Sequence, residues 1–501
     1  MSFIHFRFMY RYLFLIVTFF VVTGNSQSFA QKSRPNIIII FVDDLGYGEI
    51  EPYGQKIIQT PNLTRMAAEG MLFTDFYSSS ALCAPARCQL LTGLHTGHGA
   101  VRANFEMANG PASFTDELER GQMPLPASAH TIAEMLKPLG YATACIGKWG
   151  LGMADTEGNP NQQGFDYFYG YHDQKQAHNF YPTHLWENGE QVPLNNKSFK
   201  VHTKISPEQA TDEVFNSFIG NDYSVEMMAM KAEQFIAQQN ESPFFLYYAL
   251  TLPHLALQVP PGELELYKGK FEETPYLGEN GYCPVKYPRA TYAAMITLLD
   301  KKVGDIMKQL ETLGKKDNTL ILFTSDNGAA FPVGGADPEF FNSNGDLRDL
   351  KGSLYEGGIR IPFIAQWPGH IEKASVSSHV AAQYDIKATL ADLLQIQLPV
   401  TDGISFLPAL SGKKQKTHDY LYFELYEYGG QQAVRMNNWK AVKKNMVKDK
   451  QAKWELYNLK TDIGEMNNLA EKNPKMVIKA DKIARQSHQH HPSVPHWNFM
   501  E

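Results

Sequence analysis

The sequence has very few cysteines and lacks the charge pattern of a nucleic-acid-binding protein. Only four cysteines stand in 501 residues, at positions 83, 88, 145 and 283. This number is too small for a disulfide framework. The formal net charge is −7, and no long basic run is interleaved with aromatic residues. These features exclude a disulfide scaffold, and we expect no nucleic acid among the partners.

No segment after the first thirty residues is long and apolar enough to span a bilayer, so we expect no stable membrane insertion. The N-terminus has a different character. Arg7 and Arg11 precede an apolar run at residues 13–22, and small residues then follow at a cleavage position. This pattern predicts a cleaved signal peptide at residues 1–30. We therefore expect an exported protein, periplasmic or secreted, whose mature chain begins near Gln31.

The patterning predicts a large α/β domain followed by a smaller one. Between about residues 34 and 410, short apolar runs alternate with stretches of helical period, which is typical of a mostly parallel sheet covered on both faces. A polar, lysine-rich stretch at residues 411–416 is typical of a domain boundary. Four strand-like pieces and one helix follow it and predict a small antiparallel α+β subdomain. The predicted divisions are 31–412 and 413–501.

One predicted helix has an apolar stripe that repeats at intervals of three and four residues, and Gly314 follows it as a stop signal. We interpret this stripe as core. Its members are Tyr292, Ile296, Leu299, Val303, Ile306, Leu310 and Leu313.

Polar residues directly follow four of the predicted strands. In open parallel sheets, ligands bind at the carboxyl ends of the strands. Each polar group alone fits an ordinary turn, but the four together predict one shared site. The strands at 37–42, 141–146, 244–250 and 319–324 are followed by Asp43-Asp44, Gly147-Lys148, Pro253-His254 and Asp326-Asn327, respectively.

Cys83 is predicted to stand at the start of a helix. Pro85 fits the first turn of such a helix, and Gly93 fits its end. Backbone N–H groups and the positive end of the helix dipole favour an anion at this position, either a thiolate or a bound oxyanion. A cysteine with no further context would instead be interpreted as a buried apolar residue.

The sequence around Cys83 resembles the signature of the type I, formylglycine-dependent sulfatases, which belong to the alkaline phosphatase-like superfamily. The signature is Cys-x-Pro-x-Arg, here Cys83 to Arg87, with Leu91-Thr92-Gly93 after it. A second family motif, Gly-Tyr-x-Thr-x-x-x-Gly-Lys-Trp, matches residues 140–149. The resemblance extends in the family's order over essentially the whole mature chain, and it implies an alkaline phosphatase-like sandwich. Further matching segments are 35–48, 253–254, 325–328, 351–362, 367–369, 454–459 and 464–469.

The resemblance also implies a mechanism for hydrolysing sulfate esters. A separate maturation enzyme oxidises the cysteine, here Cys83, to formylglycine (3-oxoalanine), whose hydrate attacks the sulfur. Arg87 would orient this residue, and Lys148 and Lys351 would contact the sulfate oxygens. His254 would be the general acid for the departing alcohol.

The predicted metal ligands are almost all oxygens, which suits a hard cation such as calcium or magnesium and disfavours zinc. The resemblance favours Ca²⁺ over Mg²⁺. The ligands are predicted to be Asp43, Asp44, Asp326 and Asn327, together with the modified Cys83.

The chain departs from the family pattern at Gly150, where many members have a histidine that contacts the formylglycine. We propose His178 as a replacement or as a contact to the substrate's sugar, because it lies in a polar, aromatic loop after the same strand. His95 and His98 are the other candidates, and a histidine satisfied within its own loop is an equally good interpretation of His178.

Substrate recognition is expected from loops around the site. Arg102, Asn104 and Arg348 are placed in the sequence where they could reach a sugar. The expected reaction is exo-removal of sulfate from a sulfated carbohydrate, of which a galactose or N-acetylgalactosamine unit is one candidate.

Three other functions compete with this prediction. A phosphatase or phosphodiesterase of the same superfamily would use serine or threonine and several histidine ligands for zinc, which the acidic quartet and the Cys83 motif disfavour. A non-catalytic glycan-binding protein is compatible with Gly150 but not with the otherwise intact set of site residues. A hydrolase that uses unmodified Cys83 would need a base that the sequence does not identify.

Overall fold

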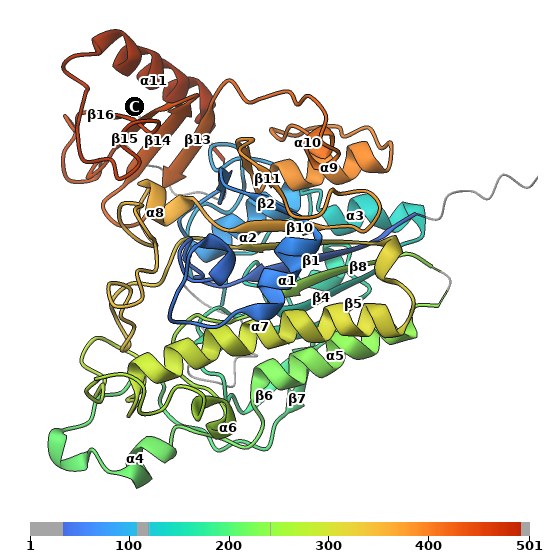
Figure 1. The fold of residues 1–501 in the computed structure, drawn as a ribbon, viewed down its shortest axis with the longest axis vertical. Coiled ribbons are helices and arrows are strands. Elements are labelled where there is room, and N and C mark those ends of the chain that lie inside the picture. Colours follow the sequence, from blue (N-terminus) through green and yellow to red (C-terminus); the bar gives the residue numbers. More distant parts are fainter. Residues whose placement is uncertain (1–33, 108–118, 120, 241, 492–501) are drawn as a thin grey trace, which may run out of the picture. The chain divides into compact units, whose positions relative to one another are not determined.

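The computed structural model describes residues 34–107, 119, 121–240 and 242–491, which belong to one compact unit beginning at Arg34 (Figure 1). The predicted signal peptide lies outside the described residues. Among the residues that are described, no helix is long and apolar enough to cross a membrane.

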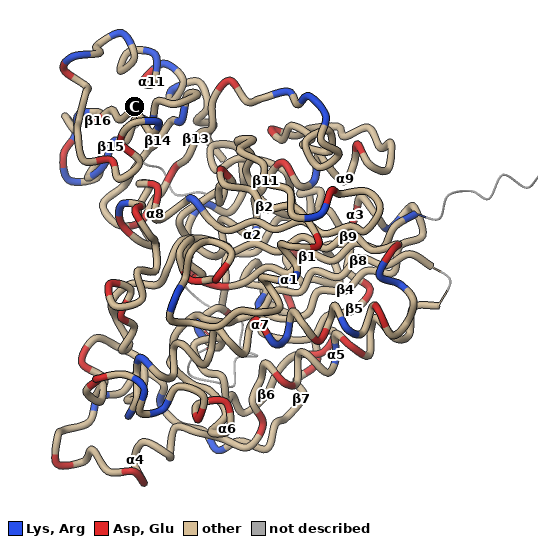
Figure 2. Tube along the Cα trace, viewed as in Figure 1, with Lys and Arg blue, Asp and Glu red and all other residues tan. Residues whose placement is uncertain are grey.

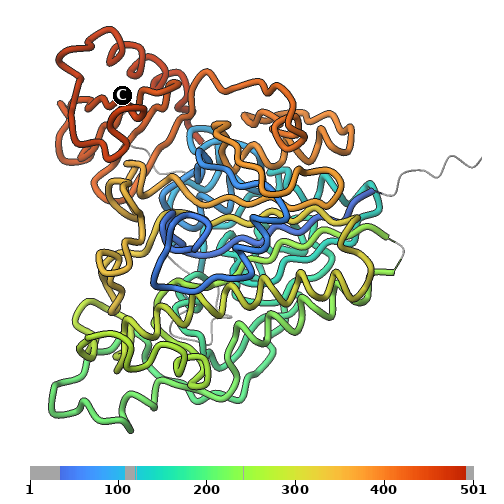
Figure 3. The backbone as a smooth tube through the Cα atoms, viewed as in Figure 1, coloured from blue at the N-terminus to red at the C-terminus, as the bar shows by residue number. Residues whose placement is uncertain are grey.

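The centre of the fold is a ten-stranded mixed sheet with the order β11-β2-β10-β9-β1-β8-β4-β5-β6-β7. Its five middle strands are parallel, and they bring distant parts of the sequence side by side (Figure 3). After Asn36, β1 is a run of apolar, mostly β-branched residues, and all its side chains are buried, as expected for a strand covered on both faces. The middle strands are β9 (Thr319–Ser325), β1 (Asn36–Val42), β8 (Phe244–Ala249), β4 (Ala142–Lys148) and β5 (Tyr167–Tyr171).

Shorter strands complete the sheet at both edges. β10 pairs antiparallel with β9, and β6 pairs antiparallel with β5. The edge strands are β10 (Phe363–Gln366), β2 (Met71–Phe73) and β11 (Ser375–Ser377) on one side, and β6 (His184–Glu187) and β7 (Glu190–Pro193) on the other. A separate parallel pair consists of β3 (Phe76–Tyr77) and β12 (Ala381–Ala382).

Helices cover both faces of the sheet, and the alternation of side chains in β1 shows why. Ile38 and Ile40 point into one apolar cluster, whereas Ile37 and Ile39 point into the other. The first cluster is closed by α1 (Pro61–Glu69), α5 (Ser224–Gln238) and α7 (Pro288–Thr312), and the second by α2 (Cys83–Thr92), α3 (Ile132–Leu136), α9 (Asp385–Leu393) and α10 (Leu407–Leu410). This confirms the predicted α/β sandwich with a mostly parallel sheet.

The predicted apolar stripe belongs to α7, and six of its seven members are buried. The exception is Leu313, which is the C-cap residue and is 40% exposed. The prediction that Leu313 is core was therefore wrong, because the helix ends one residue before it. Three further short helices are α4 (Asp212–Asn216), α6 (Pro261–Leu264) and α8 (Glu356–Ile359).

The C-terminal part is a four-stranded antiparallel sheet packed against one long helix, as predicted. Lysines and arginines are frequent on its loops and on α11 (Figure 2). Lys440 is buried between Glu356 and Glu465, at 2.9 and 3.0 Å from their carboxylate oxygens, and so joins this sheet to α8. The boundary at residue 412 stays a prediction. The elements are β13 (Leu421–Leu425), β14 (Gln431–Met436), β15 (Trp439–Lys443), β16 (Glu455–Asn458) and α11 (Pro474–Ser487).

Candidate active site

Cys83 is the first residue of α2 and is buried. The helix begins after Leu82, whose backbone is extended, and ends at Gly93, whose φ of 73° lies in the left-handed region that glycine adopts without strain. The predicted helix from Cys83 to Gly93 is thus confirmed. The Cys83 end of α2 lies at the ends of β1 and β9, and a helix N-terminus is suitable for an anion.

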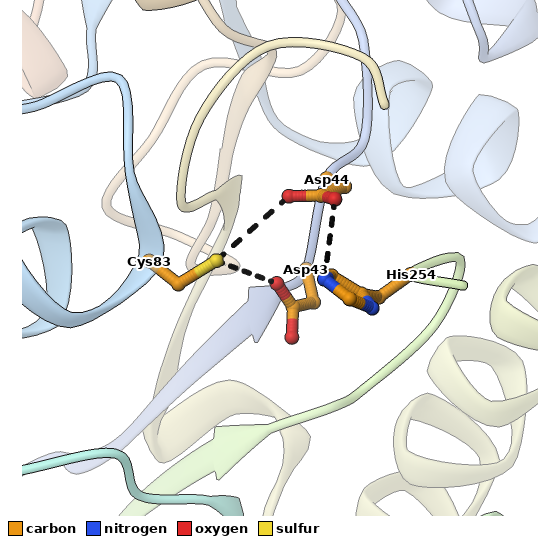
Figure 4. Close-up of side chains that lie close together, drawn as sticks. All are labelled: Asp43, Asp44, Cys83 and His254. Atoms are coloured by element: carbon orange, nitrogen blue, oxygen red, sulfur yellow. Dashed lines mark hydrogen bonds and ion pairs between the residues drawn. The ribbon is translucent and has the colours of Figure 1, made fainter. Parts of the chain in front are cut away.

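The thiol of Cys83 lies among side chains from the ends of two neighbouring strands (Figure 4). Its Sγ is 3.4 Å from Asp43 Oδ1 and 3.9 Å from Asp44 Oδ1, both directly after β1. It is also 3.8 Å from Asn327 Oδ1, which follows β9, and 3.3 Å from Lys351 Nζ. These groups are far apart in the sequence. The structure brings them together at the carboxyl ends of the parallel strands, where one shared site was predicted.

Three buried cations neutralise the carboxylates of this cluster. Lys148 Nζ at the end of β4 is 2.6 Å from Asp43 Oδ2, and Lys351 Nζ is 2.7 Å from Asp44 Oδ1. Arg87, one turn along α2, donates to Asp326 Oδ2 at 3.0 Å and to the backbone carbonyl of Lys148 at 2.7 Å. Buried charges survive only when they are paired in this way.

The backbone of Asp44 is held in the left-handed region with a φ of 64°. Its N–H donates to Asp326 Oδ1 at 3.0 Å, and its Oδ1 accepts a hydrogen bond from Asn327 Nδ2 at 2.7 Å. Aspartate tolerates this conformation better than most residues. The segments after β1 and β9 are therefore fixed to each other by one backbone-to-side-chain and one side-chain-to-side-chain hydrogen bond.

Cys83 and Asp43 are neighbours in the cluster, but their pKa values shift in opposite directions. Burial raises the pKa of the Cys83 thiol well above its usual value, and the charges of Asp326 and Asp43 raise it further. Burial would also raise the pKa of Asp43, but Lys148, His254 and Arg87 hold it well below the ordinary value. Asp43 is therefore ionised, whereas the unmodified thiol stays protonated and is a weak nucleophile.

His254 reaches the cluster from the loop after β8. Its Nε2 is 3.5 Å from Asp44 Oδ2, and its Nδ1 is 2.6 Å from the carbonyl oxygen of Leu255. Burial lowers the pKa of His254 to about 4, although the charges of Asp44 and Asp43 favour the protonated ring. A bound sulfate ester would add negative charge and raise this pKa, because a nearby anion favours the imidazolium.

The ring of His178 stacks on the ring of His254, and these two rings form part of one wall of the site. The two rings are nearly parallel, with centroids 5.0 Å apart and an interplanar angle of 17°. The other candidate histidines lie elsewhere: His98 Nδ1 is 2.9 Å from Asp402 Oδ1, and His95 stacks on His98 beyond the end of α2. Of the three histidines considered from sequence, only His178 joins the cluster.

Two residues of this wall were missed by sequence reasoning. His202 and Tyr282 both pack against the ring of His178, and their ring centroids lie 5.2 Å from it. Neither residue belongs to a motif or follows a strand of the central sheet. Nothing in the sequence pattern marked them, because the loops that place them are far apart along the chain.

Gly150 has a φ of 72°, and a β-carbon added there would lie 2.9 Å from Cγ of Gln174. Gln174 donates to Gln122 Oε1 at 2.8 Å and to Asn104 Oδ1 at 3.2 Å. Asn104 Oδ1 also accepts from the N–H of Ala84, beside the nucleophile position, at 3.0 Å. The side of the cluster at which the family's histidine would begin is therefore filled by Gln174 and Asn104.

The structure does not bring Arg102 or Arg348 to the cluster. Arg102 is buried and donates to Gly99, Tyr426 and Gln489, with Glu424 3.4 Å away. Arg348 donates to the hydroxyl of Tyr457 and the carbonyl of Glu465, and its guanidinium lies 3.8 Å from the ring centroid of Tyr355. Both guanidiniums hold the C-terminal sheet to the rest of the chain, a role that their sequence positions did not indicate.

The donor set of the cluster suits a hard divalent cation. Ligand atoms of Asp43, Asp44, Cys83 and His254 all lie within 4.8 Å of one another. Asp326 and Asn327 contact the same group and add oxygen donors. Carboxylate and amide oxygens are preferred by calcium and magnesium, whereas zinc favours nitrogen and sulfur.

The sequence is similar to those of two proteins named as sulfatases. The N-acetylgalactosamine-6-sulfatase of Rattus norvegicus is 33% identical over 392 residues, which cover 75% of this chain and 66% of that protein. The N-acetylgalactosamine-6-O-sulfatase of Bacteroides thetaiotaomicron is 29% identical over 513 residues, which cover 90% of this chain and 93% of that one. The chain thus spans about two thirds of the rat protein and nearly all of the bacterial one.

A solved structure and two family models extend the comparison. Ps i-CgsB, solved in complex with k-i-k-neocarrahexaose, has a TM-score of 0.73 and 27% identity, covering 91% of this chain and 94% of that one. A family model described as N-sulphoglucosamine sulphohydrolase, C-terminal, matches residues 349–490. The sulfatase family model matches residues 35–396. The chain therefore belongs to the sulfatase family of sulfuric ester hydrolases.

Proposed function

We propose that this protein removes sulfate from a sulfated carbohydrate by exo-hydrolysis, with residue 83 as the nucleophile after its conversion to formylglycine. The observation that supports this most strongly is the position of Cys83. It lies at a helix N-terminus, within 4 Å of side-chain atoms of Asp43, Asp44, Asn327 and Lys351. A nucleophile, cations and acidic ligands in one buried cluster meet the requirements for attack on a sulfate ester.

The direction of the pKa shift of the thiol supports a modified residue at position 83. Burial and the neighbouring carboxylates raise the pKa of Cys83, so little thiolate is present for direct attack. This disfavours a hydrolase that uses the unmodified cysteine. Oxidation to an aldehyde by a separate maturation enzyme, followed by hydration, would give the residue a hydroxyl that can attack sulfur.

The basic residues of the cluster have distinct roles in this proposal. Lys148 and Lys351 neutralise the sulfate oxygens, and both are already held in the buried cluster by carboxylates. Arg87 is fixed through two hydrogen bonds and orients residue 83 from one turn along the helix. His254 donates a proton to the departing alcohol oxygen once the bound sulfate has raised its pKa.

A divalent cation, in our proposal Ca²⁺, would be held by Asp43, Asp44, Asp326 and Asn327 together with the oxidised residue 83. Bound there, it would supply Lewis-acid stabilisation of the sulfate charge and lower the pKa of the attacking hydroxyl. The oxygen-rich donor set supports calcium or magnesium rather than zinc.

The proposed substrate is a galactose or N-acetylgalactosamine unit of a sulfated glycan. The two relatives named above act, by their names, on N-acetylgalactosamine 6-sulfate, and the similar structure of Ps i-CgsB holds k-i-k-neocarrahexaose. Within this chain, Asn104 and His178 lie next to residues of the cluster and have no other role in the proposed mechanism, so we propose them for sugar contacts. We further propose that residues 1–30 direct export to the periplasm or the medium, where such glycans are met.

The test is a panel of sulfated monosaccharides together with a matched pair of aryl sulfate and aryl phosphate. The mature protein is compared with Cys83→Ala and with Cys88→Ala, a control on the same helix whose side chain lies outside the cluster. We expect sulfate hydrolysis that is lost in Cys83→Ala and retained in Cys88→Ala. A preference for the phosphate would favour the phosphatase alternative, and binding of sulfated glycans without turnover would favour a glycan-binding protein.

A further inference from the structure

Four rings from four separate segments form one wall of the site. His178 contacts the rings of His202, His254 and Tyr282, with centroids 5.0 to 5.2 Å away. His202 and Tyr282 also contact each other at 4.9 Å. The ring of Tyr282 also lies near His254, with the two centroids 6.3 Å apart. The wall therefore connects the exposed His202 with the interior of the site.

The hydrogen bonds of this wall determine which nitrogen of each histidine carries the proton. The backbone N–H of Tyr282 donates to Nδ1 of His202, with a separation of 3.4 Å. Since Nδ1 accepts, a neutral His202 must carry its proton on Nε2. That nitrogen is 3.1 Å from Nδ1 of His178. His202 therefore donates, and His178 accepts through Nδ1.

The consequence is a fixed tautomer at His178. Its Nδ1 is occupied as an acceptor, so the proton of the neutral ring stands on Nε2. Among the described residues, no side chain or backbone group forms a hydrogen bond with that Nε2. His178 stacks on His254, the proposed general acid, so the two rings lie side by side in the site.

We propose that His202 is a positioning residue which holds His178 in the Nε2–H tautomer, so that His178 donates a hydrogen bond to a sugar oxygen beside the sulfate ester. This inference rests on the proposed function, because it assumes a sulfated sugar in the site. Burial, and then the nearby His254 and Lys148, keep the pKa of His178 well below its usual value, which agrees with a neutral ring.

The test uses the mature protein with His202→Phe, which keeps a ring against Tyr282 but removes the donor. His202→Gln is the conservative variant, since its amide can donate to the same nitrogen. His130→Phe is the matched control, because His130 is also exposed and stands outside the cluster. We expect His202→Phe to lower kcat/KM for the sulfated sugar about five- to tenfold, the effect of one lost hydrogen bond. In His202→Gln, kcat/KM should fall by less than about twofold, and in His130→Phe it should equal that of the parent protein.

Two further readouts separate positioning from general damage. An aryl sulfate has no sugar oxygen, so His202→Phe should lower kcat/KM clearly less with the aryl sulfate than with the sulfated sugar. In a His178→Ala background, adding His202→Phe should cause little additional loss, because His202 acts through His178. Equal losses with both substrates, or additive losses in the double variant, would overturn the proposal.

Nitrogen-15 NMR of labelled histidine reads the tautomer without any substrate. We expect His178 to be protonated on Nε2 in the parent protein and to become a mixture of tautomers in His202→Phe. Protonation of His178 on Nδ1 in the parent would overturn the inference even in an active enzyme. Absence of hydrolysis with every sulfate ester, with the tautomer as expected, would instead contradict the proposed function.

Discussion

Replacing Gly150 by histidine would restore the residue that many family members have, and we predict that it destabilises this protein without raising its activity. Two features of the structure oppose the change. The backbone at Gly150 has a φ of 72°, and the new β-carbon would lie 2.9 Å from Cγ of Gln174. Gln174 could yield only by giving up its hydrogen bonds to Gln122 and Asn104.

The expected loss of stability can be worked out from the backbone strain and from the displacement of Gln174. A non-glycine residue in the left-handed region costs about 1–2 kcal/mol. Displacing Gln174 removes two hydrogen bonds, each with a net contribution of about 1 kcal/mol. We therefore expect Gly150→His to lower the free energy of unfolding by about 3–4 kcal/mol. Asn104 would also lose its tie to Gln174 beside the start of α2, so kcat should fall rather than rise.

Denaturant unfolding and sulfate-ester kinetics of the mature protein test this prediction. Gly150→Ala is the matched control, because it introduces the backbone strain and the first contact with Gln174 but not the imidazole. In a Gln174→Ala background the two hydrogen bonds are already lost, so we expect Gly150→His to cost only the strain of about 1–2 kcal/mol there. If Gly150→His is as stable as the parent and turns over faster, our explanation of this glycine is wrong.

Three further predictions concern other parts of the account. Lys351→Ala should reduce kcat/KM by about 10²–10³-fold, the typical effect of removing one group that stabilises transition-state charge; a loss below tenfold would argue against its role. Removal of divalent cations with a chelator should abolish activity, and Ca²⁺ but not Zn²⁺ should restore it; full activity in the chelator would contradict the metal site. Burial raises the pKa of Glu49 from 4.5 to about 7, so its ionisation costs stability as the pH rises through this window. Relative to the parent, Glu49→Gln should therefore gain up to about 3 kcal/mol in unfolding free energy between about pH 4.5 and pH 7, and no gain would argue against a buried acid.

The elements that the sequence predicted best are those defined by local pattern. The buried β-branched run of β1 and the cysteine and glycine at the two ends of α2 have local signals, and the rule that ligands gather at parallel strand ends joined Asp43 to Asn327 correctly. These features depend on neighbours in the sequence or on a general property of α/β sheets.

The side-chain roles that the sequence did not predict depend on contacts between distant segments of the chain. Arg102 was expected near a sugar, but its partner Glu424 comes from the C-terminal sheet, which no local pattern could place beside it. Gln174 and His202 have no motif and become informative only once their neighbours are known. Side-chain roles of this kind need the tertiary structure, because their cause lies in another part of the chain.

The central claim, that Cys83 becomes the nucleophile by oxidation to an aldehyde, is tested most directly by peptide mass spectrometry. Protein exported from a host able to modify it is digested, and the peptide that contains Cys83 is compared between fractions of high and low sulfatase activity. We predict the mass loss required for conversion of the thiol to an aldehyde, in an amount that rises with specific activity. An active preparation in which Cys83 is entirely an unmodified thiol would contradict the account.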